Sequence, residues 1–294
     1  MGTESIVAEI TSLKEAVGAL IQDGDSVAFE GFTHLIPSAA GLEAIRQGKR
    51  DLNLIRMTPD LIYDQIIGMG FAKSLTFAWG GNPGVGSLHR LREAVESGWP
   101  RPLALDERSH ADMANAYAAG ASGLPFAIFR GHIGDDLPKV NPAIKHVTCP
   151  FTGEELAAVP ALNPDVAVIH AQRADRKGNV LIWGILGVQK EAVLAARRSI
   201  VTVEEIVDEL NAPPNACILP SFAVGAVCPV PHGAWPSYAQ GYYKRDNRFY
   251  KAWDAVSRER ETFRAWIERH VLATSDFAEF EASLKAAARE KAHV

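Results

Sequence analysis

The sequence predicts an α/β fold, a three-layer α/β/α sandwich with a mostly parallel sheet and a helical C-terminal tail. Short β-branched or apolar runs alternate with helix-like stretches over most of the chain. Parallel strands need crossover connections, so this alternation favours parallel pairing. The run VAVIHA at 166–171 is apolar on both faces, which is typical of a sheet covered on both sides. These observations together predict the sandwich.

The expected elements follow from these runs in chain order. Strands are expected at 25–31, 52–58, 74–80, 103–107, 126–131, 166–171, 179–184 and 199–205. Helices are expected between them at 4–22, 38–48, 59–70, 88–97, 109–120 and 187–197. The tail has no strand-like run and predicts two charge-rich helices at 247–271 and 275–291. We therefore expect an α/β domain over 1–245 and a helical extension over 246–294 packed on the same domain.

Composition narrows the class of protein. The 294 residues are 47% hydrophobic and 22% charged, with a formal net charge of −5, which does not favour a nucleic-acid partner. The three cysteines, Cys149, Cys217 and Cys228, form no C-x-x-C pair, and the N-terminus is amphipathic and charged rather than a signal peptide. No apolar run approaches the ~18 residues of a membrane span. A soluble, cytoplasmic protein without a membrane partner is expected.

The first candidate binding turn is FEGFTHLIPS at 29–38. A predicted strand ends at Gly31, and Phe32, Thr33 and His34 precede the next helix. Ligands of open α/β sheets bind beyond the carboxyl ends of strands, and glycine allows close approach to the backbone. His34 could orient an acid group. The alternative is a capped turn before a helix, with a histidine satisfied by the protein.

The second candidate is a glycine-rich loop formed by Gly80, Gly81, Asn82, Pro83, Gly84, Val85, Gly86 and Ser87. It lacks the G-x-G-x-x-G spacing of dinucleotide sites, and no Gly-Lys-Ser or Gly-Lys-Thr follows it. Its glycines can present several backbone N–H groups, and Pro83 stiffens the chain. The loop thus predicts a backbone-lined site for a flat, bulky, partly anionic ligand, the alternative being an ordinary tight loop.

The third candidate is the turn LDERSHAD at 105–112. Glu107 stands where a catalytic or substrate-orienting carboxylate would stand, and Arg108 follows it. Ser109 is a plausible N-cap with Asp112 three residues on, which is the structural alternative. A fourth turn, with Asp175 and Gly178, is expected to be a structural corner between two strands. The residues form no Ser–His–Asp order and no metal-ligand cluster, so alone they predict an α/β protein with a backbone-lined ligand site.

Longer stretches of the chain resemble a known family. VAFEGFTHLIPSAAGLEAI is similar to the glycine loop of family I coenzyme A transferases. GGNPGVGS together with ADRKGN resembles the A-type chain of the glutaconate CoA-transferase group, and the similarity covers nearly the whole chain. The resemblance implies a CoA-transferase-like (NagB/RpiA-like) fold and a CoA thioester as substrate, with no permanently bound cofactor or metal. It also implies a B-type CoA-transferase partner and transfer of CoA from succinyl-CoA to 3-oxoadipate or a similar dicarboxylic acid.

The same resemblance assigns the nucleophile to the partner. The family's glutamate lies on the B-type chain in a Glu-Asn-Gly or similar segment, and this chain contains none. A cation is needed for the distal carboxylate of the acid, and Arg108, Arg130 and His34 are candidates, with Arg130 preferred over its alternative as a salt-bridged surface arginine. Two other functions stay open. Some relatives are ring-opening hydrolases in which Glu107 would be the working carboxylate, and a third alternative is a non-catalytic CoA-thioester-binding subunit.

Overall fold

A ten-stranded sheet forms the centre of the molecule in the computed structural model, which describes residues 8–82 and 85–292 apart from the side chains of 290–292. Eight of its strands lie parallel to one another. Their order is β1 (Glu9–Ile10), β13 (Ala226–Pro229), β11 (Arg198–Val207), β9 (Val166–Asp175), β2 (Ser26–Glu30), β3 (Leu52–Arg56), β4 (Ala72–Phe77) and β5 (Ala104–Glu107). The predicted parallel sheet is confirmed.

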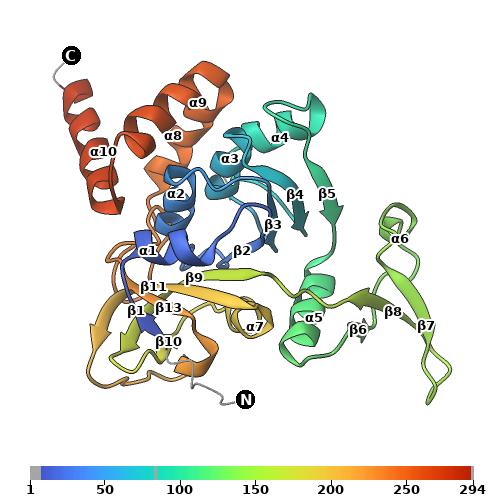
Figure 1. The fold of residues 1–294 in the computed structure, drawn as a ribbon. Coiled ribbons are helices and arrows are strands. Elements are labelled where there is room, and N and C mark those ends of the chain that lie inside the picture. Colours follow the sequence, from blue (N-terminus) through green and yellow to red (C-terminus); the bar gives the residue numbers. More distant parts are fainter. Residues whose placement is uncertain (1–7, 83–84, 293–294) are drawn as a thin grey trace.

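Helices cover both faces of this sheet (Figure 1). One face carries α1 (Leu13–Leu20), α2 (Ser38–Arg46), α3 (Leu61–Gly68) and α4 (His89–Glu96), and the other carries α5 (His110–Ala121) and α7 (Gln189–Ala195). Successive residues of a strand pack in different layers, because their side chains point to opposite faces of the sheet. Val27 and Phe29 pack with α1–α4, whereas Ala28 between them packs with α5 and α7. The predicted three-layer sandwich is therefore confirmed.

Two short strands extend the sheet in the antiparallel sense. β10 (Val180–Ile182) pairs with β9 and with β12 (Cys217–Leu219), and a 3₁₀ turn at Ser221–Ala223 follows. Asp175 closes the β9–β10 turn because its Oδ1 accepts hydrogen bonds from the backbone N of Lys177 and Asn179, each at 2.9 Å. Gly178 has φ +81° there. The predicted structural corner is confirmed.

The strand expected at 126–131 does not join the parallel sheet. β6 (Phe126–Phe129) pairs antiparallel with β8 (Glu155–Pro160), which pairs with β7 (Lys145–Thr148), in a separate sheet at the right of Figure 1. After the short helix α6 (Leu137–Val140), β7 and β8 form a hairpin, and β8 runs antiparallel to both β7 and β6. The prediction of parallel pairing for this strand is therefore wrong.

The helix expected at 4–22 is also corrected. Residues 1–7 lie outside the described part of the chain, and Glu9–Ile10 pairs with β13. The helix begins only at Leu13, because Ser12 caps it by accepting a hydrogen bond from the backbone N of Glu15 at 3.2 Å. A polar cap therefore separates a short strand from a shorter helix.

The C-terminal segment is helical, as expected, but it is divided. It contains α8 (Asn247–Arg258), α9 (Arg260–Ile267), a π-helical turn η2 (Glu268–Leu272) and α10 (Phe277–Ala292). Buried aromatic side chains join these helices to the layer of α1–α4, namely those of Tyr250, Trp253, Phe263 and Phe280. The boundary between 245 and 246 stays a prediction. Within the described residues, no helix is both long enough and apolar enough to cross a lipid bilayer.

Candidate functional site

Three of the predicted turns lie at one edge of the sheet, at the carboxyl ends of β2, β4 and β5. The backbone N of Arg108 donates to Phe77 O at 2.8 Å, and that of Ala78 donates to Met57 O at 3.2 Å. The Arg56 guanidinium donates to Gly31 O at 2.9 Å. These contacts connect the ends of β2, β3, β4 and β5 into one continuous edge, where a parallel sheet presents its ligand sites.

The turn after β2 is held by the protein itself. His34 is fully buried; its Nε2 accepts a hydrogen bond from the backbone N of Gln240 at 2.9 Å, and Nδ1 therefore carries the proton and faces Ile185 O at 3.4 Å. Burial lowers the pKa of His34 to about 4, so the ring is neutral at physiological pH. Both ring nitrogens serve the fold, and the orientation of a substrate acid by His34 stays a prediction. Thr33 is the exposed residue of this turn.

A second glycine pair, which the sequence reasoning missed, fixes this turn from the other side. A Cβ on Gly184 would lie 2.9 Å from the His34 ring, and a Cβ on Gly187 would lie 2.7 Å from Cβ of Phe32. Both glycines have positive φ, at +99° and +54°. The Phe32 ring also meets His110 of α5 edge to face, with 6.3 Å between ring centroids. The segment WGILG at 183–187 thus belongs to the site, and its two glycines were the available signal.

The glycine-rich loop is attached to α8. The Asn82 side-chain N donates to Tyr250 O at 2.7 Å, and a Cβ on Gly86 would lie 2.9 Å from the carboxylate of Asp254. A Cβ on Gly80 would have its nearest neighbour at 3.8 Å. Pro83 and Gly84 lie outside the described residues. Gly86 is therefore constrained by the packing of the protein, whereas Gly80 has room on its open side.

A cavity of about 460 Å³ lies beside this loop. Its lining includes Gly80, Gly81, Gly86 and Ser87 of the loop and the partly exposed apolar side chains of Trp79, Leu91, Val95 and Leu105. Trp79 is 48% exposed, and Arg92 and Glu96 stand at the same cavity. Apolar walls with a few polar groups are typical of a small-molecule site.

The turn after β5 has one exposed acid and one fully engaged cation. Glu107 is exposed, and its backbone O accepts a hydrogen bond from the Asn141 side chain at 2.8 Å. Arg108 is buried and pairs with Asp106 at 2.9 Å and with Asp112 at 3.4 Å. Burial raises the pKa of Asp112. Because two carboxylates already hold Arg108, its predicted role as the cation for a distal carboxylate stays a prediction.

Ser109 is the N-cap of α5, as the sequence predicted. Its Oγ accepts a hydrogen bond from the backbone N of Asp112 at 3.0 Å. Arg130 directly follows β6 of the separate three-stranded sheet, and its side chain forms two hydrogen bonds with the Glu154 carboxylate at 2.8 and 2.9 Å. The loop after Arg130 packs against the turn after β5, where the His132 ring lies 3.6 Å from the Asp112 carboxylate. The contact of Arg130 with a substrate acid stays a prediction.

A buried polar network beneath the edge was not foreseen. The Glu30 carboxylate accepts hydrogen bonds from the Tyr117 hydroxyl at 2.9 Å and from the backbone N of Met57 at 3.3 Å. Burial raises the pKa of Glu30. Arg56 pairs with Asp60 at 3.0 Å, also inside the protein. The one signal in the sequence was a glutamate at the end of the apolar run SVAFE. Within the described part of the chain, no group of three or more His, Cys, Asp or Glu side chains could hold a metal ion.

Comparisons with known proteins agree with this fold. The sequence model described as "Coenzyme A transferase" matches residues 10–228. The A-type chain of the 3-oxoadipate CoA-transferase of Pseudomonas knackmussii is 68% identical over 278 residues, which cover 95% of this chain and 99% of that protein. The crystal structure of glutaconate coenzyme A-transferase from Acidaminococcus fermentans superimposes with a TM-score of 0.87 at 32% identity and covers 95% of this chain and 94% of that one.

A more distant relative has another chemistry. The cholesterol ring-cleaving hydrolase IpdA subunit of Rhodococcus jostii is 28% identical over 59% of this chain and 62% of its own length. The family match spans most of the chain, and the two more similar relatives cover nearly all of it. The chain therefore belongs to the coenzyme A transferase family.

Proposed function

We propose that this chain is the A-type component of a two-subunit CoA-transferase that moves CoA from succinyl-CoA to 3-oxoadipate. The observation that carries the proposal is the 68% identity, along 95% of the chain, with the corresponding chain of a 3-oxoadipate CoA-transferase. The sheet edge supports it, because three turns, one of them the glycine-rich loop, meet there around an open backbone surface. The cavity beside the loop combines the apolar walls of Trp79 and Leu105 with a few polar groups, which suits a thioester arm.

The chemistry proceeds through the partner's glutamate. Its carboxylate attacks the succinyl thioester carbon, the C–S bond breaks, and an acyl-glutamyl anhydride and CoA thiolate form. The thiolate attacks the glutamyl carbonyl, which gives a glutamyl-CoA thioester and succinate. A carboxylate of 3-oxoadipate then repeats the two steps in the reverse sense, and 3-oxoadipyl-CoA leaves with the glutamate restored. Backbone N–H groups of the loops in this chain would stabilise each tetrahedral oxyanion.

The carboxylates of this chain support the placement of the nucleophile on the partner. The sequence has no Glu-Asn-Gly segment. Glu30, beneath the edge, is buried and bonded to Tyr117, so it has no access to a thioester. Glu107 is exposed at the end of β5, and we assign it an orienting role toward substrate or water. The chain by itself would then be inactive.

Reconstitution tests the proposal. The purified chain should form no 3-oxoadipyl-CoA from succinyl-CoA and 3-oxoadipate, and activity should appear when a B-type partner is added. The control is the B-type partner without this chain, which should also be inactive. Transfer by the isolated chain would refute the division of roles. If the complex binds the thioester but neither transfers its CoA nor hydrolyses the substrate, the non-catalytic alternative is favoured.

The second candidate is a CoA-thioester ring-opening hydrolase that uses Glu107. It is favoured by the exposure of Glu107 at a strand end and by the resemblance to a ring-cleaving hydrolase. The variant Glu107→Gln separates the two functions. Loss of a positioned acid–base group costs about 10²–10⁴-fold in rate, whereas loss of an orienting contact should cost less. The matched variant Asp106→Asn alters the neighbouring carboxylate, which contacts Arg108 and Asn141.

A further inference from the structure

The turn after β2 has a backbone shape that the rest of the protein must impose. Thr33 and Leu35 have φ angles of +60° and +53°, although neither residue is glycine. Left-handed conformations of this kind are costly for other residues and persist only where the surroundings fix them. Thr33 is the exposed residue of this turn at the sheet edge. The contacts that hold the turn therefore matter for the site.

Residues 232–240 provide these contacts. The three residues from 33 to 35 each form a hydrogen bond with this segment, although it lies far away in the sequence. The bonds join Thr33 O to the Ser237 hydroxyl at 2.9 Å, His34 Nε2 to the backbone N of Gln240 at 2.9 Å, and the backbone N of Leu35 to Tyr238 O at 3.0 Å. The backbone N of Ala39 in α2 also donates to Gly233 O at 2.9 Å. The 232–240 segment thus supports the turn along its whole length.

The carboxylate of Glu204, in β11, holds the beginning of the 232–240 segment. Its Oε2 accepts a hydrogen bond from the backbone N of His232 at 2.7 Å, and its Oε1 accepts one from the Tyr243 hydroxyl at 2.7 Å. The same hydroxyl accepts a hydrogen bond from the backbone N of Ala234 at 3.0 Å. One carboxylate therefore fixes the segment directly at His232 and through Tyr243 at Ala234.

Glu204 is a buried and charged anchor. It is 7% exposed, and the fully buried His170 of β9 donates from Nε2 to its Oε1 at 2.7 Å. Burial acts to raise the pKa of this carboxyl, but the interactions with His170, His232 and Tyr243 outweigh it and hold the pKa below its ordinary value. Hydrogen bonds to a charged acceptor are about twice as strong as neutral ones. The anchor is therefore strong, and the proposed chemistry gives it no other role.

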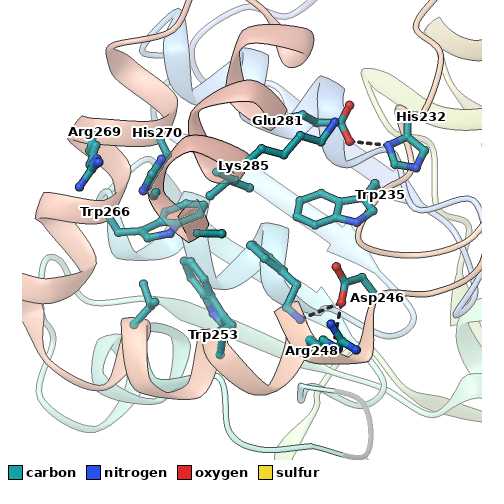
Figure 2. Close-up of a pocket in the computed structure, with 16 residues that line it drawn as sticks. His232, Trp235, Asp246, Arg248, Trp253, Trp266, Arg269, His270, Glu281 and Lys285 are labelled. Atoms are coloured by element: carbon teal, nitrogen blue, oxygen red, sulfur yellow. Dashed lines mark hydrogen bonds and ion pairs between the residues drawn. The ribbon is translucent and has the colours of Figure 1, made fainter. Parts of the chain in front are cut away.

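A second contact reaches the same end of the segment from the C-terminal helices. The His232 ring pairs with the carboxylate of Glu281 in α10 (Figure 2). The His232 side chain is 36% exposed, so solvent screens this pair more than it screens the buried contacts of Glu204. Glu204 is thus the main support of the 232–240 segment.

We propose that Glu204 is a positioning residue for the CoA transfer. Its carboxylate anchors the 232–240 segment, and that segment holds the turn after β2 in its left-handed shape. The inference rests on the proposed function, in which the reacting thioester lies at this sheet edge. Glu204 does not touch the substrate. A displaced turn would impair the geometry of the reacting atoms, whereas the glycine-rich loop would still bind the CoA arm, so the loss should appear in kcat rather than in KM.

The variant Glu204→Gln tests the anchor in the reconstituted complex. Glutamine keeps the size of the side chain, but it replaces one acceptor oxygen with a donor group, so it cannot accept all the hydrogen bonds that Glu204 accepts. We expect kcat to fall by about 10- to 100-fold, because a displacement of about 1 Å can cost about 10²-fold in rate. The KM for succinyl-CoA should stay within about twofold.

Glu205→Gln is the matched control. Glu205 follows Glu204 in β11 and also pairs with a base and a tyrosine, Arg173 and Tyr242, each at 2.6 Å. Its side chain is 42% exposed, and these two partners lie outside the 232–240 segment. Glu205→Gln should therefore keep the kcat of the unaltered complex.

A pair of tyrosine variants gives the same comparison if Glu204→Gln does not fold. Tyr243→Phe keeps the ring but removes the hydroxyl that bridges Glu204 and Ala234, so it should lower kcat with little change in KM. Tyr242→Phe removes the hydroxyl that donates to Glu205 and should keep kcat.

Hydrogen exchange of the chain alone separates positioning from a general loss of stability. In Glu204→Gln, the backbone amides of Leu35 and Ala39 should exchange at least about fivefold faster, because local opening of the turn then costs less free energy. The amide of Arg108, which donates to Phe77 O at the turn after β5, should exchange as it does in the unaltered chain.

The proposal is overturned if exchange at Leu35 is unchanged, or if exchange at Arg108 rises equally. It is also overturned if Glu204→Gln raises KM and keeps kcat, or if Glu205→Gln lowers kcat as much. Hydrogen exchange requires no substrate. An unaltered complex without transferase activity would therefore refute the proposed function, while the exchange rates would still decide whether Glu204 holds the turn.

Discussion

Two glycines of the loop at 80–87 differ in what surrounds them. A Cβ on Gly80 meets nothing closer than 3.8 Å, whereas a Cβ on Gly86 lies 2.9 Å from the Asp254 carboxylate. We therefore expect Gly80→Ala to keep the stability of the chain and to raise the KM of the complex for succinyl-CoA, because the new methyl group stands where the thioester would pass. Gly86→Ala should instead lower the free energy of unfolding. Urea denaturation and initial rates measure the two effects. An unchanged KM for Gly80→Ala would remove this part of the loop from the binding site.

Asp64 makes stability depend on pH. It is buried, it accepts hydrogen bonds from the backbone N of Arg90 and Leu91 and from the Trp253 indole, and burial raises its pKa from 3.8 to about 6. The folded protein thus holds this proton more tightly than the unfolded chain does. Its contribution to stability is present below pH about 4 and is lost as the pH rises through about 6. At about 1.4 kcal/mol per pKa unit, the change is on the order of 3 kcal/mol.

The variant Asp64→Asn tests this assignment, since an amide does not titrate. The free energy of unfolding of the unaltered chain minus that of this variant should fall as the pH rises across that window. Asp51→Asn is the control, because a hydrogen bond from Arg101 lowers the pKa of Asp51 and gives its contribution the opposite pH dependence. A difference that is constant from pH 4 to pH 6 would contradict the raised pKa.

Ser109, at the start of α5, has two possible roles: its hydroxyl caps the helix or contacts the substrate. Its hydroxyl accepts the hydrogen bond that caps the helix. Ser109→Ala should cost about 1 kcal/mol of stability, while Ser109→Thr should keep most of it. Ser122→Ala, at the exposed C-terminal cap of the same helix, is the control and should cost less. If Ser109→Ala raises the KM for succinyl-CoA and leaves stability unchanged, the hydroxyl contacts substrate rather than the helix.

Elements with strong local patterns could be predicted from the sequence. The strands at 25–31 and 52–58 follow from apolar runs, and the N-cap at Ser109 follows from a local spacing. The sheet formed by β6, β7 and β8 could not be predicted, because its strands are short and half-exposed and their pairing depends on a hairpin rather than on a periodic pattern.

Within the site, the hydrogen-bond partners of key side chains could not be predicted, because they lie far away in the sequence. The hydrogen bond to His34 comes from Gln240, 206 residues away, and the one to Glu30 comes from Tyr117, 87 residues away. A local motif shows that these residues stand at a strand end, but it does not show that their polar atoms are already occupied. Arg130 is the same case, because Glu154 lies beside another strand of the separate sheet.

At the scale of the whole molecule, the chain supplies a sheet edge with backbone surfaces and an exposed Glu107, but its sequence has no Glu-Asn-Gly glutamate. The C-terminal helices complete this arrangement. α8 packs in the hydrophobic layer of α1–α4, and its Tyr250 and Asp254 position the glycine-rich loop. We infer that this frame binds the thioester, whereas a partner protein performs the covalent step.

Trapping of the covalent intermediate tests this division of roles. The reconstituted complex is incubated with succinyl-CoA and treated with borohydride or hydroxylamine, and both of its chains are then analysed by mass spectrometry. We expect a modified glutamate on the partner, no modification on this chain, and the same adduct when this chain carries Glu107→Gln. An adduct on Glu107, or consumption of water with no adduct on either chain, would contradict it.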